Sequence, residues 1–304
     1  MTTADAPAVQ RVRAKVPGPR ERAGDRFFRL IITFFAGLIL ASALALAWQL
    51  TRESLSTWKT FGASFLWTST WDPVNDQFGA LPFLYGTAVS SLLALLIAVP
   101  LGVGAAVFLT ELAPKRLAES LMFAIELLAA VPSVILGLMG IFLLVPAMRW
   151  AGAPYGVGMM TAGLILAFMI LPYITTITRE VLLTVPRPLK EAMYALGATR
   201  WEVVRGVSLP FARSGIIGAV FLSLGRALGE TMAVTMVIGN APKIAWNPLE
   251  PGYSMASVIA NELAEAASDA HLSALVAIGL VLMGVTVVVN GAARLMIYRL
   301  GSRK

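Results

Sequence analysis

Six separate apolar runs, each about 20 residues or longer, dominate this sequence. A run of that length crosses the roughly 30 Å hydrocarbon core of a bilayer as one helix, which satisfies its own backbone hydrogen bonds. The composition agrees, because 58% of the 304 residues are hydrophobic and only 13% are charged. The sequence therefore predicts an all-α polytopic membrane protein. We place its six transmembrane helices at residues 27–48, 83–110, 119–147, 158–178, 213–239 and 272–297.

The distribution of Lys and Arg predicts how these helices are oriented. With a cytoplasmic N-terminus, the segments inside carry 19 of these residues and the segments outside carry 4. This bias predicts that both termini are cytoplasmic, and it explains the net charge of +7 without nucleic acid as a partner. Residues 1–26 are rich in Pro and Arg and lack apolar periodicity. They predict a disordered basic cytoplasmic tail ahead of a membrane domain at 27–304.

The residue types exclude several chemistries. The chain has no cysteine and a single histidine, His271. Disulfides, Cys-ligated zinc, iron–sulfur clusters, His-based metal sites and His-dependent catalytic triads are therefore excluded. The phosphate-binding pattern G-x-x-x-x-G-K-[ST] of many ATPases is absent from the sequence as well. We expect no metal, no cofactor and no enzyme activity in this chain.

Three prolines, at positions 100, 132 and 172, fall inside the second, third and fourth predicted helices. Each removes one backbone hydrogen bond and favours a kink. Structural shaping and a gating hinge are both open readings of these kinks.

The predicted cytoplasmic segment 179–213 is polar but has the signals of a folded element. Pro188 can begin a short helix over residues 189–196, and Gly197 can end it in a left-handed cap. Thr199 and Glu202 have capping-box spacing and predict a second short helix, which Gly206 is expected to end. The segment therefore predicts a compact helical hairpin.

This hairpin resembles the EAA loop of the permeases of ATP-binding-cassette importers, over residues 188–210. The family pattern is E-A-A, three residues, G, nine residues, I-x-L-P, with Met193 and Val207 here as mild departures. The matching positions are Glu191, Ala192, Gly197, Leu209 and Pro210. In that family the loop couples the permease to a cytoplasmic ATPase subunit. The resemblance implies ATP-driven import with the type I importer fold, and a separate chain that hydrolyses ATP.

Span five carries two opposite charges, Arg226 and Glu230, four residues apart and thus expected on one helical face. Arg226 lies 13 residues after Arg213, about 20 Å along a helix, beyond the bilayer midplane. A charge at such depth costs about 2.5–3.5 kcal/mol on insertion scales. The pair is interpreted as a polar site on a translocation path, with a buried structural pair as the alternative. Thr231 adds a hydroxyl beside it.

Glu126 lies about 10 Å into the third predicted helix. It can be neutral and hydrogen-bonded, can pair with Arg226 or with an arginine of a partner, or can repel anions on the path. We include it among the candidate path residues.

Span five, with the sequence G-R-A-L-G-E-T-M-A-V, also resembles the permeases of the phosphate-specific import system. Similar support comes from L-A-A-V-P-S-V at 128–134 and from F-G-A-L-P at 78–82, the latter closer to the PstC-type subunit. The resemblance implies inorganic phosphate as substrate and a prokaryotic inner-membrane location. It also implies three kinds of partner: a second permease (PstA-type), two copies of an ATP-binding subunit (PstB-type) and an extracytoplasmic phosphate-binding protein (PstS-type).

Other readings remain open at this point. Arginine and hydroxyl groups suit sulfate or molybdate as well as phosphate, and an intramembrane enzyme acting on lipid phosphates is a further, less favoured class. The aromatic residues of the predicted external segment 49–82 fit either an interfacial belt or a dock for an external partner.

Overall fold

The computed structural model describes residues 19–301, and the chain divides into two units, 1–49 and 50–304. The first unit contains most of the long helix α1 (Pro19–Glu53). Residues 19–26, expected to belong to a disordered tail, form the first turns of α1, whose Pro19 suits a helix start because its missing N–H is not needed there. Residues 1–18 of the predicted tail lie outside the described residues.

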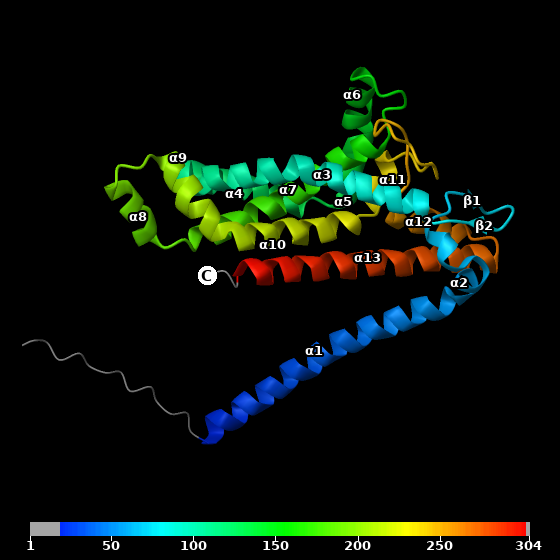
Figure 1. Ribbon diagram of the computed structural model, residues 1–304, viewed down its shortest axis with the longest axis horizontal. Coiled ribbons are helices and arrows are strands. Elements are labelled where there is room, and N and C mark those ends of the chain that lie inside the picture. Colours follow the sequence, from blue (N-terminus) through cyan, green and yellow to red (C-terminus); the bar gives the residue numbers. More distant parts are fainter. Residues whose placement is uncertain (1–18, 302–304) are drawn as a thin grey trace, which may run out of the picture. The chain divides into compact units, whose positions relative to one another are not determined.

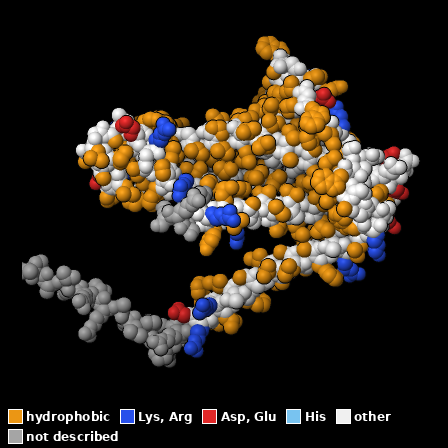
Figure 2. Space-filling view, viewed as in Figure 1, with side chains coloured by type: hydrophobic (Ala, Val, Ile, Leu, Met, Phe, Trp, Pro, Cys, Tyr) orange, Lys and Arg blue, Asp and Glu red, His pale blue; other side chains and the backbone are white. Residues whose placement is uncertain are grey.

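Four long helices run alongside one another in the second unit (Figure 1). They are α3 (Leu81–Val107), α7 (Met159–Leu183), α10 (Leu209–Leu228) and α13 (Asp269–Gly301). Helix α7 is central, because 61% of its apolar window is buried, against 22–33% for the other spans of this unit. Hydrophobic side chains cover the middle of the visible face, and charged side chains gather toward its two ends (Figure 2).

The described part of the chain contains six helices long and apolar enough to cross a membrane, as expected. They cover Gly24–Glu53, Leu81–Leu112, Ser133–Trp150, Met159–Leu183, Arg200–Leu228 and Asp269–Arg299. Helices α3 and α7 continue through Pro100 and Pro172.

The third span differs from the prediction of one helix over 119–147. Helix α4 (Lys115–Ala130) ends before Pro132, and a new helix begins beyond it. Pro132 pushes Val131 into an extended conformation (ψ 127°), which interrupts the helix rather than kinking it. The third span consists of α5 (Ser133–Met139), the π-helical turn η3 (Gly140–Leu144) and α6 (Val145–Trp150).

One end of the second unit is a small folded layer, here called the platform. It contains α2 (Leu55–Phe61), the 3₁₀ turn η1 (Gly62–Leu66), the strands β1 (Trp71–Asp72) and β2 (Gln77–Phe78), α12 (Met255–Glu262) and the 3₁₀ turn η5 (Leu263–Glu265). The two strands pair antiparallel, with Trp71 opposite Phe78. Most aromatic residues of segment 49–82 pack here against the start of α13, so they form a core rather than an open surface; Trp67 is the exposed exception.

A hydrogen-bonded group ties the platform together around Glu262. Its Oε2 accepts a hydrogen bond from Trp71 Nε1 at 2.9 Å and lies 3.1 Å from Nε2 of the buried His271, so it joins β1, α12 and α13. Burial, with a smaller contribution from the charge of Glu262, raises the pKa of Tyr253 to about 12. Its hydroxyl oxygen accepts a hydrogen bond from Asn261 Nδ2 at 3.0 Å.

Helix α3 is fixed tightly to this platform. A Cβ on Gly86 would overlap the carbonyl oxygen of Tyr253, so the two backbones touch here. On the next residue, Thr87 Oγ1 accepts a hydrogen bond of 2.9 Å from the backbone N–H of Met255. Only glycine allows such an approach of a helix to another backbone.

The other end of the second unit carries the predicted hairpin, formed by α8 (Arg187–Ala195), α9 (Arg200–Val203) and the π-helical turn η4 (Val204–Ser208). Gly197 has φ +84°, and Thr199 and Glu202 form a complete capping box, as expected. The expectation that Gly206 ends the second helix is wrong. The chain continues helically through η4 into α10, because a π-turn accommodates Gly206 without a break.

Candidate functional site

The guanidinium group of Arg226, in the last turn of α10, lies over the ring of Tyr173 on α7, with Cζ 4.5 Å from the ring centre. This is the geometry of a cation–π contact. The arginine side chain is exposed in this chain, and no carboxylate forms an ion pair with it among the residues that the structure describes. Its positive charge is therefore oriented by an aromatic ring and left available to an anion.

The expected helical pair between Arg226 and Glu230 does not form. Helix α10 ends at Leu228, and residues 229–231 are not helical before α11 (Met232–Val237) begins. Glu230 instead accepts a long hydrogen bond, 3.5 Å, from the backbone N–H of Ala233. Spacing of four residues places two side chains on one face only within a continuous helix. Thr231 immediately precedes α11, and its backbone carbonyl accepts a hydrogen bond from the hydroxyl group of Thr235.

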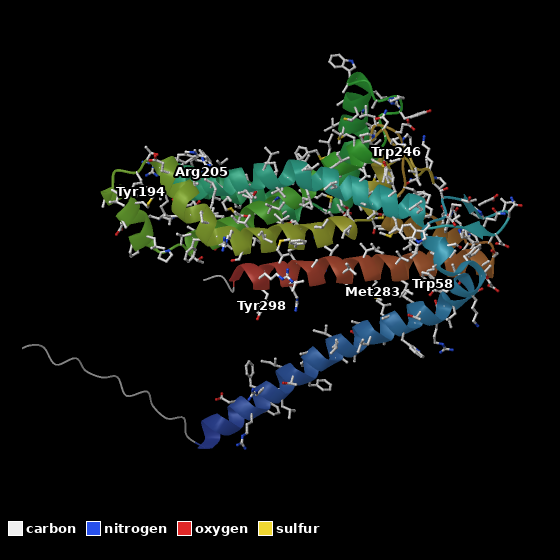
Figure 3. All side chains as sticks on the ribbon, viewed as in Figure 1. Trp58, Tyr194, Arg205, Trp246, Met283 and Tyr298 are labelled. Carbon is white, nitrogen blue, oxygen red and sulfur yellow. The ribbon has the colours of Figure 1, made fainter. Side chains whose placement is uncertain are left out.

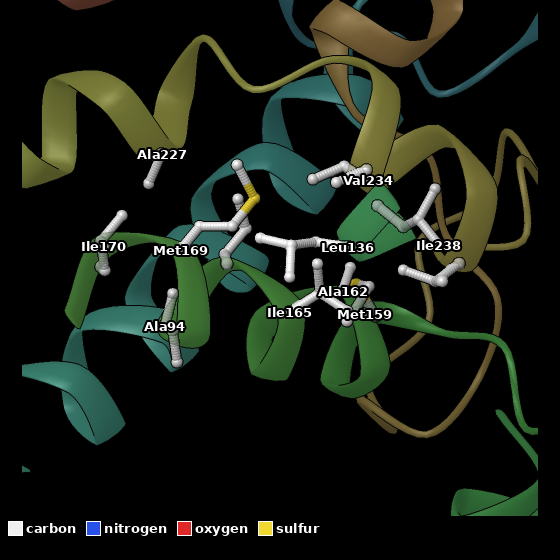
Figure 4. Close-up of a cluster of buried hydrophobic side chains, with 14 of the residues drawn as sticks. Ala94, Leu136, Met159, Ala162, Ile165, Met169, Ile170, Ala227, Val234 and Ile238 are labelled. Carbon is white, nitrogen blue, oxygen red and sulfur yellow. The ribbon is translucent and has the colours of Figure 1, made fainter. Parts of the chain in front are cut away.

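The interruption after Leu228 is held in place by packing from the third span. Helix α11 lies against α5 so closely that a Cβ on Gly137 would be 2.7 Å from the Met236 sulfur and 2.9 Å from the Ala233 Cα. Apolar side chains of α5, α7 and α11 meet here, with Ala227 on the α10 side of the break (Figure 4). Two interrupted spans therefore stabilise each other at this depth.

Glu126 is exposed on α4, and no ion pair involves it within the described part of the chain. The structure does not pair it with Arg226. Of the three readings offered for Glu126, pairing with Arg226 inside this chain is thus wrong.

The hairpin residues of the EAA-like pattern occupy two different environments. Glu191, Ala192 and Gly197 are exposed on α8 and its cap. Leu209 packs on a small core with Leu182 and Val204, and Pro210 lies in the first turn of α10. The hairpin thus has an open outer side and an anchored base. Large apolar side chains are also exposed on the hairpin, among them Tyr194 (Figure 3), Leu196 and Trp201.

The capping box fixes the second half of the hairpin. The Thr199 backbone N–H and hydroxyl both donate to Glu202 Oε2, at 2.7 and 2.8 Å. Glu202 N–H in turn donates to Thr199 Oγ1 at 3.4 Å, so the start of α9 is held by reciprocal hydrogen bonds.

Sequence reasoning missed two residues, Tyr173 and Glu111. Glu111 lies in the π-helical turn η2 (Phe108–Leu112) that follows α3, and its Oε1 accepts hydrogen bonds from Lys190 Nζ at 2.6 Å and Ser208 Oγ at 2.8 Å. A single carboxylate at the end of an apolar run is typical of an ordinary span boundary, so the sequence held no signal for this contact.

A protein family described as "Binding-protein-dependent transport system inner membrane component" matches residues 98–301, which contain the hairpin, Arg226 and the interrupted spans. The chain belongs to this family. It is therefore a multi-pass inner membrane protein that serves as a transport component and is not an enzyme.

Relatives of this inner membrane component cover nearly its whole length. A protein of Mesorhizobium japonicum named "Phosphate transport system permease protein PstC" is 45% identical over 301 residues, which cover 92% of this chain and 90% of the relative. A protein of the same name from Pasteurella multocida is 44% identical, with 92% and 93% covered. "Phosphate transport system permease protein PstC 2" of Mycobacterium tuberculosis is 38% identical, with 90% and 91% covered.

Solved structures show the fold of this component. A chain of a bacterial alginate ABC transporter has a TM-score of 0.66 at 15% identity, covering 92% of this chain and 97% of its own. A chain of the MetNI methionine ABC transporter, in an inward-facing conformation, has a TM-score of 0.56 at 21% identity, covering 73% and 94%. The component thus has the type I ABC importer permease fold.

Proposed function

We propose that this chain is the PstC-type permease subunit of an ATP-driven importer of inorganic phosphate. It forms half of the translocation path with a PstA-type permease, and two copies of a PstB-type ATP-binding subunit drive it. A PstS-type binding protein delivers phosphate from outside. The names of relatives 38–45% identical over nine-tenths of the chain support the phosphate assignment.

The proposal includes an orientation. The hairpin and both termini face the cytoplasm, and the platform faces outward. The excess of Lys and Arg in the predicted inside segments supports this arrangement. The hairpin then offers its exposed Glu191, Ala192 and Gly197 to the ATP-binding subunit, while Leu209 and Pro210 anchor it to α10.

One observation carries the choice of an anion as substrate: the guanidinium of Arg226 is exposed, stacked on Tyr173 and without an acidic partner among the described residues. An isolated charge at membrane depth is costly and is placed almost always toward a water-filled interior or bundle. Guanidinium presents donors in a planar fork that matches the oxygens of a phosphate group. A contact through one arginine holds the ion weakly enough to release it.

The interruption at residues 229–231 supports the same path. Irregular backbone within a membrane is tolerated only where protein buries it or where it lines an aqueous cavity. Gly229 is exposed and Glu230 and Thr231 are half-buried in this chain, so the segment has an open side beside Arg226. Glu230 and Thr231 line the path on this proposal, and Glu126, exposed on α4, is a further candidate path residue that repels anions.

Reconstitution tests the proposal. The chain is purified with its partner permease and ATPase, placed in proteoliposomes, and supplied with binding protein and radiolabelled phosphate. We expect ATP-dependent phosphate uptake that sulfate and molybdate do not compete away. Arg226→Gln abolishes uptake but leaves assembly with the ATPase intact, whereas Arg213→Gln, on the same helix but at its other end, retains uptake. Uptake of sulfate or molybdate in place of phosphate, or normal uptake by Arg226→Gln, would refute the assignment.

A further inference from the structure

A single carboxylate joins the end of the second span to both arms of the hairpin. Glu111 Oε1 accepts from Lys190 Nζ on α8 at 2.6 Å and from Ser208 Oγ in η4 at 2.8 Å. The Glu111 side chain is only 9% exposed and that of Lys190 only 20%. By contrast, the Lys115–Glu119 pair on the neighbouring helix α4 is 3.9 Å long and exposed, 89% and 63%.

Burial makes this contact energetically different from a surface ion pair. Exposed pairs of Lys and Glu contribute little, whereas charge-assisted hydrogen bonds shielded from water are short and strong. Removing one partner of a buried pair leaves the other charge uncompensated. The hairpin is therefore fastened to η2 by an interaction that resists separation.

The backbone around this carboxylate is unusual on both sides. Glu111 lies in the π-helical turn η2 and Ser208 in the π-helical turn η4, so the contact joins two such turns across 97 residues. Short π-helical turns within α-helices are rare and occur frequently at functional sites. An open recess of about 680 Å³ lies next to the contact, lined by Glu111–Pro114, Tyr194 and Arg200. The hairpin and the residues that follow η2 therefore face one another across an open recess.

We infer that Glu111 is a positioning residue that transmits displacement of the hairpin to the second span. When the ATP-binding subunit moves α8, Lys190 moves with it. The hydrogen bond from Lys190 to the Glu111 carboxylate then displaces η2 and, with it, α3. The same carboxylate moves η4, which continues into α10 and Arg226. Two spans then respond together to one displacement. This inference rests on the proposed function of the hairpin.

The test uses the complete transporter in proteoliposomes. It compares three variants, Glu111→Gln, Lys190→Gln and the double variant that combines them. Glu119→Gln, which removes the exposed ion pair on α4, is the matched control. Two quantities are measured: phosphate imported per ATP hydrolysed, and the ATP-dependent change in thiol reactivity of a Met232→Cys reporter beside residues 229–231. This chain has no other cysteine, so label found on this chain reports position 232 alone. The second quantity does not depend on the transported anion, so it tests Glu111 even if phosphate is not the substrate.

We expect Glu111→Gln and Lys190→Gln each to lower phosphate imported per ATP about fivefold or more, the usual lower range of coupling between sites. Both lose the ATP-dependent change at position 232, while Glu119→Gln keeps both quantities. The double variant is no worse than either single variant, because residues in one interaction are not additive. Two results would overturn the inference: wild-type coupling in Glu111→Gln, or losses that only follow a fall in assembled transporter while the ratio stays constant.

Discussion

Arg226 and Tyr173 come from two neighbouring helices, and the arginine Cζ lies 4.5 Å from the centre of the tyrosine ring. The contact joins the last turn of α10 to the middle of α7, the most buried helix of the bundle. The ring both orients the guanidinium and shields one of its faces. An anion can therefore approach from the other face and the edge.

Two substitutions of Tyr173 distinguish the contribution of its ring from that of its hydroxyl group. A cation–π contact contributes about 0.5–2 kcal/mol, so Tyr173→Leu is expected to weaken the apparent affinity for phosphate by about two- to thirtyfold. Tyr173→Phe keeps the ring and is expected to behave like the wild type. Initial rates of uptake over a range of phosphate concentrations, with saturating binding protein, measure the effect. Equal values for Leu and Phe at this position would mean that the ring does not position Arg226.

Gly197→Val tests the left-handed cap of the hairpin. A Cβ at this position meets nothing within 4 Å, so the cost is backbone strain at φ +84°, about 1–2 kcal/mol, and not a clash. We expect the variant to insert and assemble but to lose binding-protein-stimulated ATP hydrolysis and uptake. Gly197→Asn, which tolerates this conformation better, is the milder control. Full coupling in the valine variant would show that the cap does not direct the hairpin.

Thiol labelling tests the orientation. A cysteine at Val74, which is 91% exposed in the turn between β1 and β2, is expected to react with an impermeant reagent added outside intact cells. A cysteine at the exposed Arg187 is expected to react only after the cells are opened. The reverse pattern would place the platform inside and remove the coupling role of the hairpin.

The Glu262 group predicts a stability effect confined to the platform. Glu262→Leu leaves the indole N–H of Trp71 and the buried His271 without their acceptor, which is expected to cost about 1–3 kcal/mol. Glu262→Gln keeps an acceptor oxygen and is expected to cost less, and Glu265→Leu alters a nearby exposed carboxylate. Thermal unfolding of the purified chain in detergent measures all three. If Glu262→Leu unfolds at the same temperature as Glu262→Gln, the hydrogen bonds do not hold the platform.

The sequence predicted those elements whose formation depends on residues close together in the chain. Six apolar runs predicted six spans, and Gly197 with the Thr199–Glu202 spacing predicted the hairpin, because caps depend on residues within one turn. The interruption at 229–231 was not predictable in this way. Apolar residues flank Gly229, Glu230 and Thr231 on both sides, as in a continuous span, and the interruption is held by the packing of α11 against Gly137, almost a hundred residues earlier.

The same distinction applies to the candidate site. Arg226 was recognised from its own charge, but its partner Tyr173 is on another helix and has no charge to mark it. The two partners of Glu111 are 79 and 97 residues away in the sequence. The aromatic residues of segment 49–82 were interpreted as an interfacial belt or a dock, and not as a core, because their burial depends on α13, which follows almost two hundred residues later.

Gly86 predicts a further stability effect, on the second span. Gly86→Ala places a methyl group on the Tyr253 carbonyl oxygen, and we expect a loss of about 1–3 kcal/mol or a displaced α3. Gly104→Ala, on the same helix, meets nothing within 4 Å and is expected to be neutral or slightly stabilising. Thermal unfolding in detergent, together with uptake, compares the two. Equal stability of both variants would show that the platform yields easily at this point.

The contact at Gly86 also determines what kind of movement α3 can make. Its platform end has no clearance toward Tyr253, whereas its opposite end is attached through Glu111 to the hairpin. A helix that is held at one end and pulled at the other tilts about the held end and does not translate along its axis. With the pivot at Gly86 and about 25 residues between pivot and carboxylate, a small tilt is amplified along roughly 38 Å of helix. On the inference drawn for Glu111, the length of this arm then sets how far the hairpin end of α3 moves for a given tilt.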